Sequence, residues 1–242
     1  APAEGLPVSV AIAPADSLTI AEPVVVPAGA TSVEVEMTGA LEEGTATVGF
    51  GLSPEAITTT VSVTFMAKPA VGLILMELFY DPQGADDGLE WVKLYNGTDA
   101  AIDLQSYAIG WGGTDYTYGL VNLAGVIEPG ACFVVGGPLA SEANGTPTVD
   151  QSYNFEPDIQ NSGSTADAVA LFAMTSSNVT ATTAPLDAVV YGTENKNGLL
   201  DETGAAGTVD EAKAPSGSSL LRVGLDAWSN NATPNAVACP VF

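Results

Sequence analysis

The sequence predicts an all-β protein built from two β-sandwiches in tandem. In several segments polar and apolar side chains alternate with a period of two, the pattern of a strand with one face in a core and the other in water. Clusters of Gly, Pro, Asn and Asp separate these segments, as they do in sandwiches. The 242 residues contain no sustained 3.6-residue apolar stripe, so we expect little helix.

The first expected domain covers residues 1–68. Val33, Val35 and Met37 alternate with polar residues, and a Thr-rich alternation runs from Thr58 to Phe65, so each segment is expected to form a strand. Further β-rich runs predict strands at Val8–Ile12, Leu18–Val26 and Thr45–Gly51. The connector 67–72 contains Pro69 between two strand patterns and indicates a domain boundary.

The second expected domain covers residues 69–242. Its β-rich runs are Leu73–Tyr80, Glu90–Tyr95, Ala131–Val135, Val169–Ala173, Ala188–Tyr191 and Ser219–Val223. We expect a core of apolar strand residues, each worth about 1.5–3 kcal/mol when buried. These residues are Leu75, Val92, Leu94, Phe133, Val135, Leu171, Val189 and Leu221. Residues 144–163 contain two prolines and few aliphatic residues, which predicts an irregular surface loop.

Charge excludes two classes of partner. The chain has 5 Lys plus Arg against 29 Asp plus Glu, a formal net charge of -24. Binding to nucleic acid or anionic lipid needs clustered cations, and five scattered ones supply no patch. No apolar run reaches the roughly 18 residues that a membrane helix needs. The sequence therefore predicts neither nucleic-acid binding nor membrane insertion.

Composition also argues against catalysis. The chain has no histidine, which removes the usual general base near neutral pH and the commonest transition-metal ligand. Carboxylates alone would have to carry a reaction, and a glycosidase needs two of them facing each other across a cleft. The adjacent acids of this sequence sit in turns instead. We therefore expect no enzymatic activity.

The two cysteines, Cys132 and Cys239, predict a disulfide. They lack the spacing of a metal or redox motif, and a structural disulfide indicates an oxidising, extracellular or cell-surface location. Such a bond would close a loop of about a hundred residues, worth on the order of 4 kcal/mol. Two buried free thiols are the alternative. The start of the chain, Ala1-Pro2-Ala3, is typical of a mature fragment of a longer secreted protein.

An acidic turn is the candidate metal site. Asp81, Asp86, Asp87 and Glu90 lie within ten residues, together with two glycines. Calcium prefers six to eight oxygen ligands from flexible acidic loops, although the spacing here does not match an EF-hand. No other cofactor is expected. The alternative is a solvated acidic turn without a ligand.

The single arginine and two aromatic residues complete the candidate residues. Arg222 lies in an expected strand, where a partly buried guanidinium needs a carboxylate, and we expect Glu77 or Glu90 to supply it. Trp91 and Tyr95 lie on the strand face opposite Val92 and Leu94. They could stack against a sugar ligand, or they could simply cover the sheet.

Residues 72–240 contain a series of separated segments: Leu75–Leu78 leading to Tyr80-Asp81-Pro82, Glu90–Asn96, Ile127–Gly130, Asp187–Gly192, Ser219–Arg222 and Thr233-Pro234. In their order these segments resemble the bacterial lamin-tail domain. Met76 and Lys93 depart from the family pattern. In residues 1–68, VVVPAGATSVEVEMTG followed by EEGTATVGFG resembles bacterial immunoglobulin-like repeats. These resemblances imply two immunoglobulin-like β-sandwiches, the second lamin-tail-like.

The resemblance implies a non-catalytic structural or adhesive module of a larger bacterial secreted or surface protein. Its expected partners are other domains of that protein, together with a surface protein or a glycan. One alternative is a calcium-dependent carbohydrate-binding module. A further alternative is an accessory domain of a secreted metal-dependent hydrolase.

Overall fold

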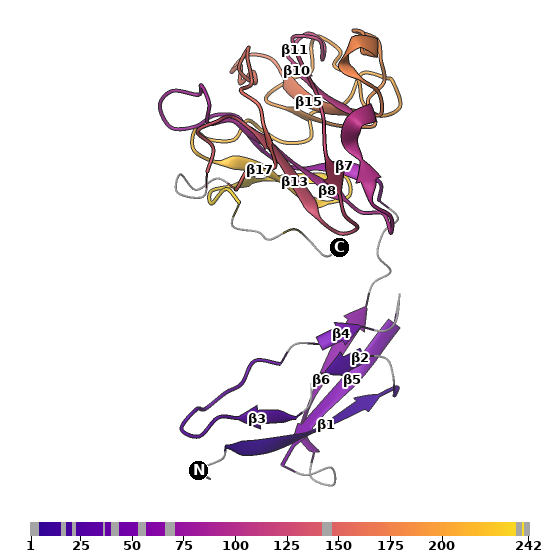
Figure 1. Cartoon of the computed structure of the whole chain (residues 1–242), viewed down its shortest axis with the longest axis vertical. Coiled ribbons are helices and arrows are strands. Elements are labelled where there is room, and N and C mark those ends of the chain that lie inside the picture. Colours follow the sequence, from indigo (N-terminus) through magenta and orange to yellow (C-terminus); the bar gives the residue numbers. More distant parts are fainter. Residues whose placement is uncertain are drawn as a thin grey trace. The chain divides into compact units, whose positions relative to one another are not determined.

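The structure is a computed structural model of the chain and describes residues 5–15, 18–20, 23–35, 37–39, 44–52, 57–65, 71–141, 147–235 and 239. It confirms the all-β class: helix in these ranges is limited to the 3-10 turns η1 (Leu104–Ser106) and η3 (Ser176–Asn178). None of the described helices is long and apolar enough to cross a membrane. The chain divides into two compact units, 1–69 and 70–241 (Figure 1).

The smaller unit contains a four-stranded antiparallel sheet in the order β3-β1-β5-β6 and a two-stranded sheet of β2 and β4. The strands are β1 (Leu6–Ala13), β2 (Leu18–Ile20), β3 (Val24–Val26), β4 (Met37–Gly39), β5 (Gly44–Gly51) and β6 (Ile57–Phe65). Leu18, Ile20, Val24, Ala46 and Val48 form its buried core. The alternating patterns at β1, β5 and β6 thus correspond to strands of one sheet.

Two strand predictions in this unit were wrong. The single strand expected over Leu18–Val26 is two short strands, β2 and β3, which belong to different sheets. The strand expected around Val33 and Val35 is not formed in residues 31–35, and β4 begins only at Met37. Alternation reports which side chains face the core, and Val35 does pack there, but a strand also needs a backbone partner.

The larger unit is built on two sheets, of order β14-β13-β8-β7-β17-β18 and β11-β10-β15-β16, with a small pair of β9 and β12 (Figure 1). The first sheet contains β7 (Leu73–Phe79), β8 (Trp91–Asn96), β13 (Cys132–Gly136), β14 (Gln151–Ser152), β17 (Ser219–Gly224) and β18 (Ala227–Asn231). The second contains β10 (Ala108–Gly112), β11 (Gly119–Asn122), β15 (Asp167–Phe172) and β16 (Asp187–Tyr191). The small pair is β9 (Ile102–Asp103) with β12 (Val126–Ile127). The β-rich runs of the sequence did not include β10, β11 and β18, or the two-residue strands β9, β12 and β14.

The main core lies between these two sheets. All but one of the expected core residues belong to it, and the exception is Leu221, which is only half-buried. Leu220 takes its place, because Leu220 pairs with Leu78 on the core face of β7 while Leu221 pairs with Glu77 on the other face. A shift of one residue exchanges the two faces of a strand. Arg222 therefore points to the same side as Leu220.

A β-bulge in β7 sets these faces. The register between β7 and β8 shifts between Leu75 and Glu77, leaving Met76 as the extra residue. Strict alternation would place Leu75 and Leu78 on opposite faces, but with the bulge both enter the main core. Glu77 consequently lies on the outer face, opposite Lys93 in β8.

A second layer covers the outer face of the β11-β10-β15-β16 sheet. Ala168, Ala170 and Phe172 of β15 pack there with Tyr116 and Leu199, which come from loops. The expected surface loop at 144–163 also differs from prediction where it is described. Phe155 and Ile159 are each 1% exposed and enter the main core. A few well-spaced apolar residues are sufficient to bury a loop when its polar backbone finds partners.

Cys132 and Cys239 form the predicted disulfide, with a sequence separation of 107 residues. The bond attaches the C-terminal segment to the start of β13. Near it, Pro129 and Gly130 form a turn in which Gly130 has φ 70° and Ala131 N donates to Glu128 O, as in a type II turn. The disulfide thus fixes Cys239 to the first residue of β13.

Removing this disulfide should lower the free energy of unfolding by roughly 4–5 kcal/mol, because the cross-link restricts the unfolded chain. Urea denaturation of the Cys132→Ser/Cys239→Ser variant under oxidising conditions measures the loss. In reducing buffer the wild type should fall to the level of the variant. Equal stabilities in oxidising buffer would contradict the prediction.

Candidate functional site

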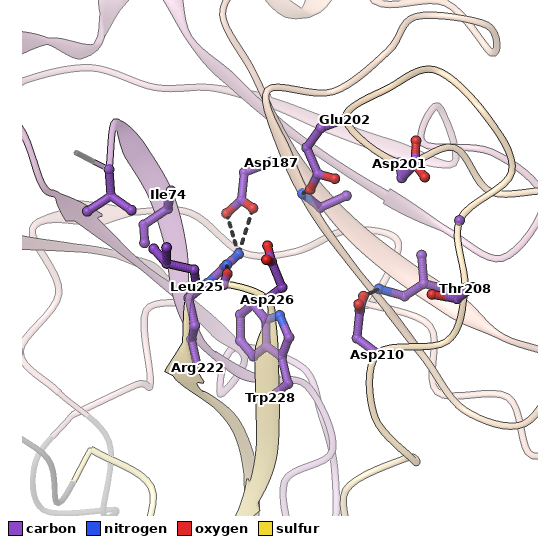
Figure 2. Close-up of a pocket in the computed structure, with 14 residues that line it drawn as sticks. Ile74, Asp187, Asp201, Glu202, Thr208, Asp210, Arg222, Leu225, Asp226 and Trp228 are labelled. Carbon is purple, nitrogen blue, oxygen red and sulfur yellow. Dashed lines mark hydrogen bonds and ion pairs between the residues drawn. The ribbon is translucent and has the colours of Figure 1, made fainter. Parts of the chain in front are cut away.

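A pocket of about 450 Å³ opens where β16 of one sheet approaches β7 and β17 of the other. Its walls come from these strands, from the segment 201–210 and from the β17–β18 hairpin (Figure 2). Five carboxylates and one guanidinium line it: Asp187, Asp201, Glu202, Asp210, Asp226 and Arg222. The pocket is therefore strongly acidic, and the role of each charged group decides what it can do.

Arg222 and Asp187 form a buried ion pair between the two sheets. Arg222 Nη2 donates to both carboxylate oxygens of Asp187, at 2.6 and 2.8 Å, and their side chains are 5% and 7% exposed. Figure 2 shows the two groups facing each other, with Trp228 beside the guanidinium. Arg222 Cζ lies 4.7 Å from the centroid of the Trp228 ring. Arg222 Nη1 also donates to Leu225 O. The guanidinium is thus enclosed by a carboxylate, a ring and a carbonyl.

The same two side chains complete the backbone hydrogen bonding of β7. The pairing of β17 with β7 covers Leu220 and Leu221 only. Beyond it, Leu75 N donates to Asp187 Oδ2 at 2.6 Å, and Arg222 Nε donates to Leu75 O at 2.8 Å. An unpaired buried peptide group is costly, so the ion pair satisfies a strand as well as joining two sheets.

Burial raises the pKa of Asp187 to about 6, although Arg222 and the Leu75 N–H both favour the ionised form. Burial disfavours the charged carboxylate more strongly than these partners favour it. The ion pair therefore adds little net stability, because the cost of burying both charges offsets their attraction. Its role is to fix the positions of β16, β17 and β7 relative to one another.

Two other carboxylates protect the free edge of β16, which is the outer strand of its sheet. Ala188 N donates to Glu202 Oε1 at 2.7 Å, and Val190 N donates to Asp210 Oδ2 at 2.8 Å. Asp210 N also donates to Val190 O at 2.8 Å. Exposed strand edges invite pairing with other chains, and acidic side chains in this position block it.

Asp201 is also engaged, because its Oδ1 accepts from Thr203 N and Oγ1 and from Ala205 N in a turn. Asp226 lines the pocket and is exposed. The described residues include no group of three or more Asp, Glu, Cys or His arranged to hold a metal ion. The acids of this pocket therefore act mainly as hydrogen-bond acceptors for backbone.

The expected partners of Arg222 were wrong. Arg222 is buried as expected, but Asp187 is its carboxylate partner in place of Glu77 or Glu90. Glu77 lies on the other face of the sheet because of the bulge in β7, and Glu90 accepts a bond from Ile159 N instead. Both glutamates are buried and already engaged elsewhere.

Glu77 belongs to a second buried polar network. Its Oε2 accepts from Lys93 Nζ at 2.7 Å. Its Oε1 accepts from Ser219 Oγ at 2.6 Å, from Asn231 Nδ2 at 3.1 Å and from Asn235 N at 3.0 Å. Lys93 Nζ donates further to Asn235 Oδ1 at 3.0 Å. This network fastens the chain after β18 to the outer face of β7 and β8.

Three of the four acids of the candidate calcium site, Asp81, Asp87 and Glu90, each have a separate partner. Asp81 pairs with Lys213 at 3.0 Å, and Asp87 accepts from Asn154 Nδ2 at 2.7 Å. Burial raises the pKa of Asp86. Glu90 is 2% exposed, and burial followed by the negative charge of Asp158 raises its pKa to about 9, against the opposing bond from Ile159 N. The described structure does not gather these four residues into one ligand group.

Trp91 and Tyr95 are 0% and 1% exposed and cannot serve as a stacking platform. Trp91 stacks on Phe79 with ring centroids 5.7 Å apart and packs with Val134 and Ala140. Trp91 Nε1 is the buried side-chain polar atom that lacks a hydrogen-bond partner in the described ranges. Other segments of the chain cover this outer face of the sheet that contains β8. The alternation of side chains along β8 gives no sign of this cover.

Sequence analysis missed Asp187, Glu202 and Asp210 as partners. A signal existed for Asp187, because it opens the otherwise apolar strand DAVVY. A carboxylate in a strand buried throughout must have a cationic or hydrogen-bonding partner, and Arg222 is the only arginine. No comparable signal marks Glu202 or Asp210, which lie in an irregular segment.

No protein-family model matches the chain, and no curated protein matches it. A crystal structure of a DUF4876 family protein from Bacteroides thetaiotaomicron VPI-5482, at 2.50 Å resolution, is similar over 86% of each chain, with 11% sequence identity and a TM-score of 0.36. A similarity this weak supports no argument about the site, so the function is argued from the chain's own geometry.

Removing one partner of the ion pair between Arg222 and Asp187 should destabilise the larger unit strongly. Arg222→Met leaves a buried carboxylate without its cation, which costs about 3–5 kcal/mol. The double variant Arg222→Met/Asp187→Asn should recover part of this loss, because no charge remains buried. Chemical denaturation of both variants gives the values. A single variant as stable as the wild type would contradict the role of the pair.

Stability should fall as pH rises because of Glu90. The pKa of the Glu90 carboxyl is 4.5 ordinarily and about 9 in the folded state, so below pH 4.5 Glu90 is protonated in both states and stability is highest. Between pH 4.5 and 9 the unfolded chain releases this proton more readily, which lowers the free energy of unfolding of the wild type. Since Gln does not titrate, the free energy of unfolding of Glu90→Gln should rise relative to that of the wild type by up to about 1.4 kcal/mol per pH unit in this range. Urea unfolding from pH 5 to pH 9 measures the difference. The exposed Glu128→Gln is the control and should follow the wild type.

Proposed function

We propose that the chain is a non-catalytic, extracellular structural or adhesive module of a larger secreted or surface protein. This proposal rests on one observation: the buried carboxylates and most of those in the acidic pocket accept hydrogen bonds from the protein's own backbone. Asp187, Glu77, Glu202 and Asp210 each hold a strand or a chain segment in place. A reaction needs groups that are free to engage a substrate.

We propose further that the chain is an immunoglobulin-like domain followed by a lamin-tail-like sandwich. It is supported by the two facing sheets of the larger unit and by the division into two compact units. Segments that carry the resemblance also hold Asp187 and Arg222, whose ion pair joins the sheets. A module of this kind acts as a rigid spacer or a contact surface between other domains.

The disulfide supports the extracellular location, because such bonds persist in oxidising compartments. The net charge of -24 supports a role in which the module stays hydrated and repels its own copies. Its expected partners are the other domains of the parent protein and a surface protein or a glycan.

A turnover screen tests the proposal. The purified chain should show no activity above buffer on ester, phosphoester, glycoside and peptide substrates, with or without added calcium, magnesium, manganese or zinc. Any activity should be checked against Glu202→Gln/Asp226→Asn, which removes charge from the pocket. Activity that follows the purified protein and disappears in this variant would overturn the non-catalytic function.

A further inference from the structure

We propose that the β10–β11 loop, residues 113–118, forms a binding site for neutral carbohydrate together with Gln160. The inference rests on the proposed adhesive function and specifies its ligand class. The site is a second pocket of about 310 Å³, lined by Thr114, Asp115, Thr117, Tyr118 and Gln160. It lies on the sheet opposite the one that contains Trp91 and Tyr95.

An exposed aromatic ring marks this pocket. Tyr118 is 50% exposed, and among the aromatic side chains that the structure describes it alone is exposed to this degree. An exposed ring is costly to hydrate and provides a flat apolar face. The C–H face of a sugar ring is the kind of surface that such a face accepts, while the phenol hydroxyl remains available for hydrogen bonding.

Polar side chains beside the Tyr118 ring can hydrogen-bond to the hydroxyls of a sugar. Gln160 offers an amide with two donors and an acceptor, and Thr114 offers a hydroxyl that is both donor and acceptor. Neither side chain has a hydrogen-bond partner among the residues with described positions. A sugar presents several hydroxyls in fixed directions, and mixed donors and acceptors beside an apolar face match that pattern.

The loop is held in place before any ligand arrives. Tyr116 is 2% exposed, its hydroxyl donates to Leu200 O at 2.5 Å, and its ring meets Phe172 edge-on at 5.8 Å. Asp115 Oδ1 accepts from Thr117 N at 2.7 Å and from Thr117 Oγ1 at 2.6 Å. A preformed loop loses little conformational entropy on binding.

Glycine brings Gln160 to this loop. A Cβ at Gly113 would lie 2.4 Å from Asp167 Oδ1 and 2.9 Å from Gln160 Oε1, so a larger residue would force the segments apart. Asn197 Nδ2 donates to Gly113 O at 2.8 Å and secures the loop from a further segment. The close approach places the amide and Tyr118 in the lining of one pocket.

Charge selects the class of sugar. The chain carries a net charge of -24, and Asp115 lies in the pocket itself, so uronic, sialic and sulfated sugars are repelled. Neutral hexoses and N-acetylhexosamines remain. The contacts are aromatic stacking and hydrogen bonds from protein groups, so binding requires no calcium ion.

The test is an array of neutral cello-, xylo-, manno- and chito-oligosaccharides with sialylated and sulfated glycans beside them, probed with the full chain in EDTA. A positive glycan is then titrated by calorimetry. Tyr118→Ala and Gln160→Ala should each weaken binding about tenfold or more, the loss of one aromatic or polar contact. Tyr118→Phe should retain most of the affinity. Val126→Ala, at a side chain that is 55% exposed elsewhere on the same unit, is the matched control.

Thermal melting checks that each variant remains folded, since the substituted side chains are exposed or half-buried. A flat array with folded protein overturns the proposal, as does binding that survives both Tyr118→Ala and Gln160→Ala. Binding that EDTA abolishes overturns the metal-free site. Cleavage of a bound glycan would instead overturn the non-catalytic function, while absence of binding leaves the structural role intact.

Discussion

The ion pair between Arg222 and Asp187 is the interaction on which the larger unit depends. Arg222 comes from β17 and Asp187 from β16, so their bond joins the two sheets at one edge of the core. Both side chains also bond to Leu75 of β7, where β17 no longer supplies backbone partners. Loss of either partner would remove this link between the sheets and leave the N–H or the C=O of Leu75 without its side-chain partner at the same time.

The acidic composition has a structural use that net charge alone does not suggest. Glu202 and Asp210 accept backbone hydrogen bonds along the edge of β16. Glu77 accepts a hydrogen bond from Asn235 N, in the segment that follows β18. A chain with few cations uses its carboxylates as acceptors for N–H groups. Burial then raises the pKa of several of them, including Asp187 and Glu90, so the folded state favours mildly acidic conditions.

The acidic pocket has a structural use, whereas we propose a recognition role for the pocket beside Tyr118. In the acidic pocket, the carboxylates face backbone N–H groups and Arg222. In the pocket beside Tyr118, a rigid loop presents an exposed ring and polar groups that the protein leaves unused. A rigid sandwich that carries its contacts on a loop is a common solution, because the loop can vary without loss of the core.

Period-two alternation and turn residues were sufficient for the all-β class, most of the longer strands and the main core, and two cysteines without a motif were sufficient for the disulfide. The partner of Arg222, the burial of Trp91 and the shift from Leu221 to Leu220 were decided only by tertiary structure. The physical reason is that alternation is local. A single bulge at Met76 reverses the faces beyond it, and sheet order determines which side chains meet.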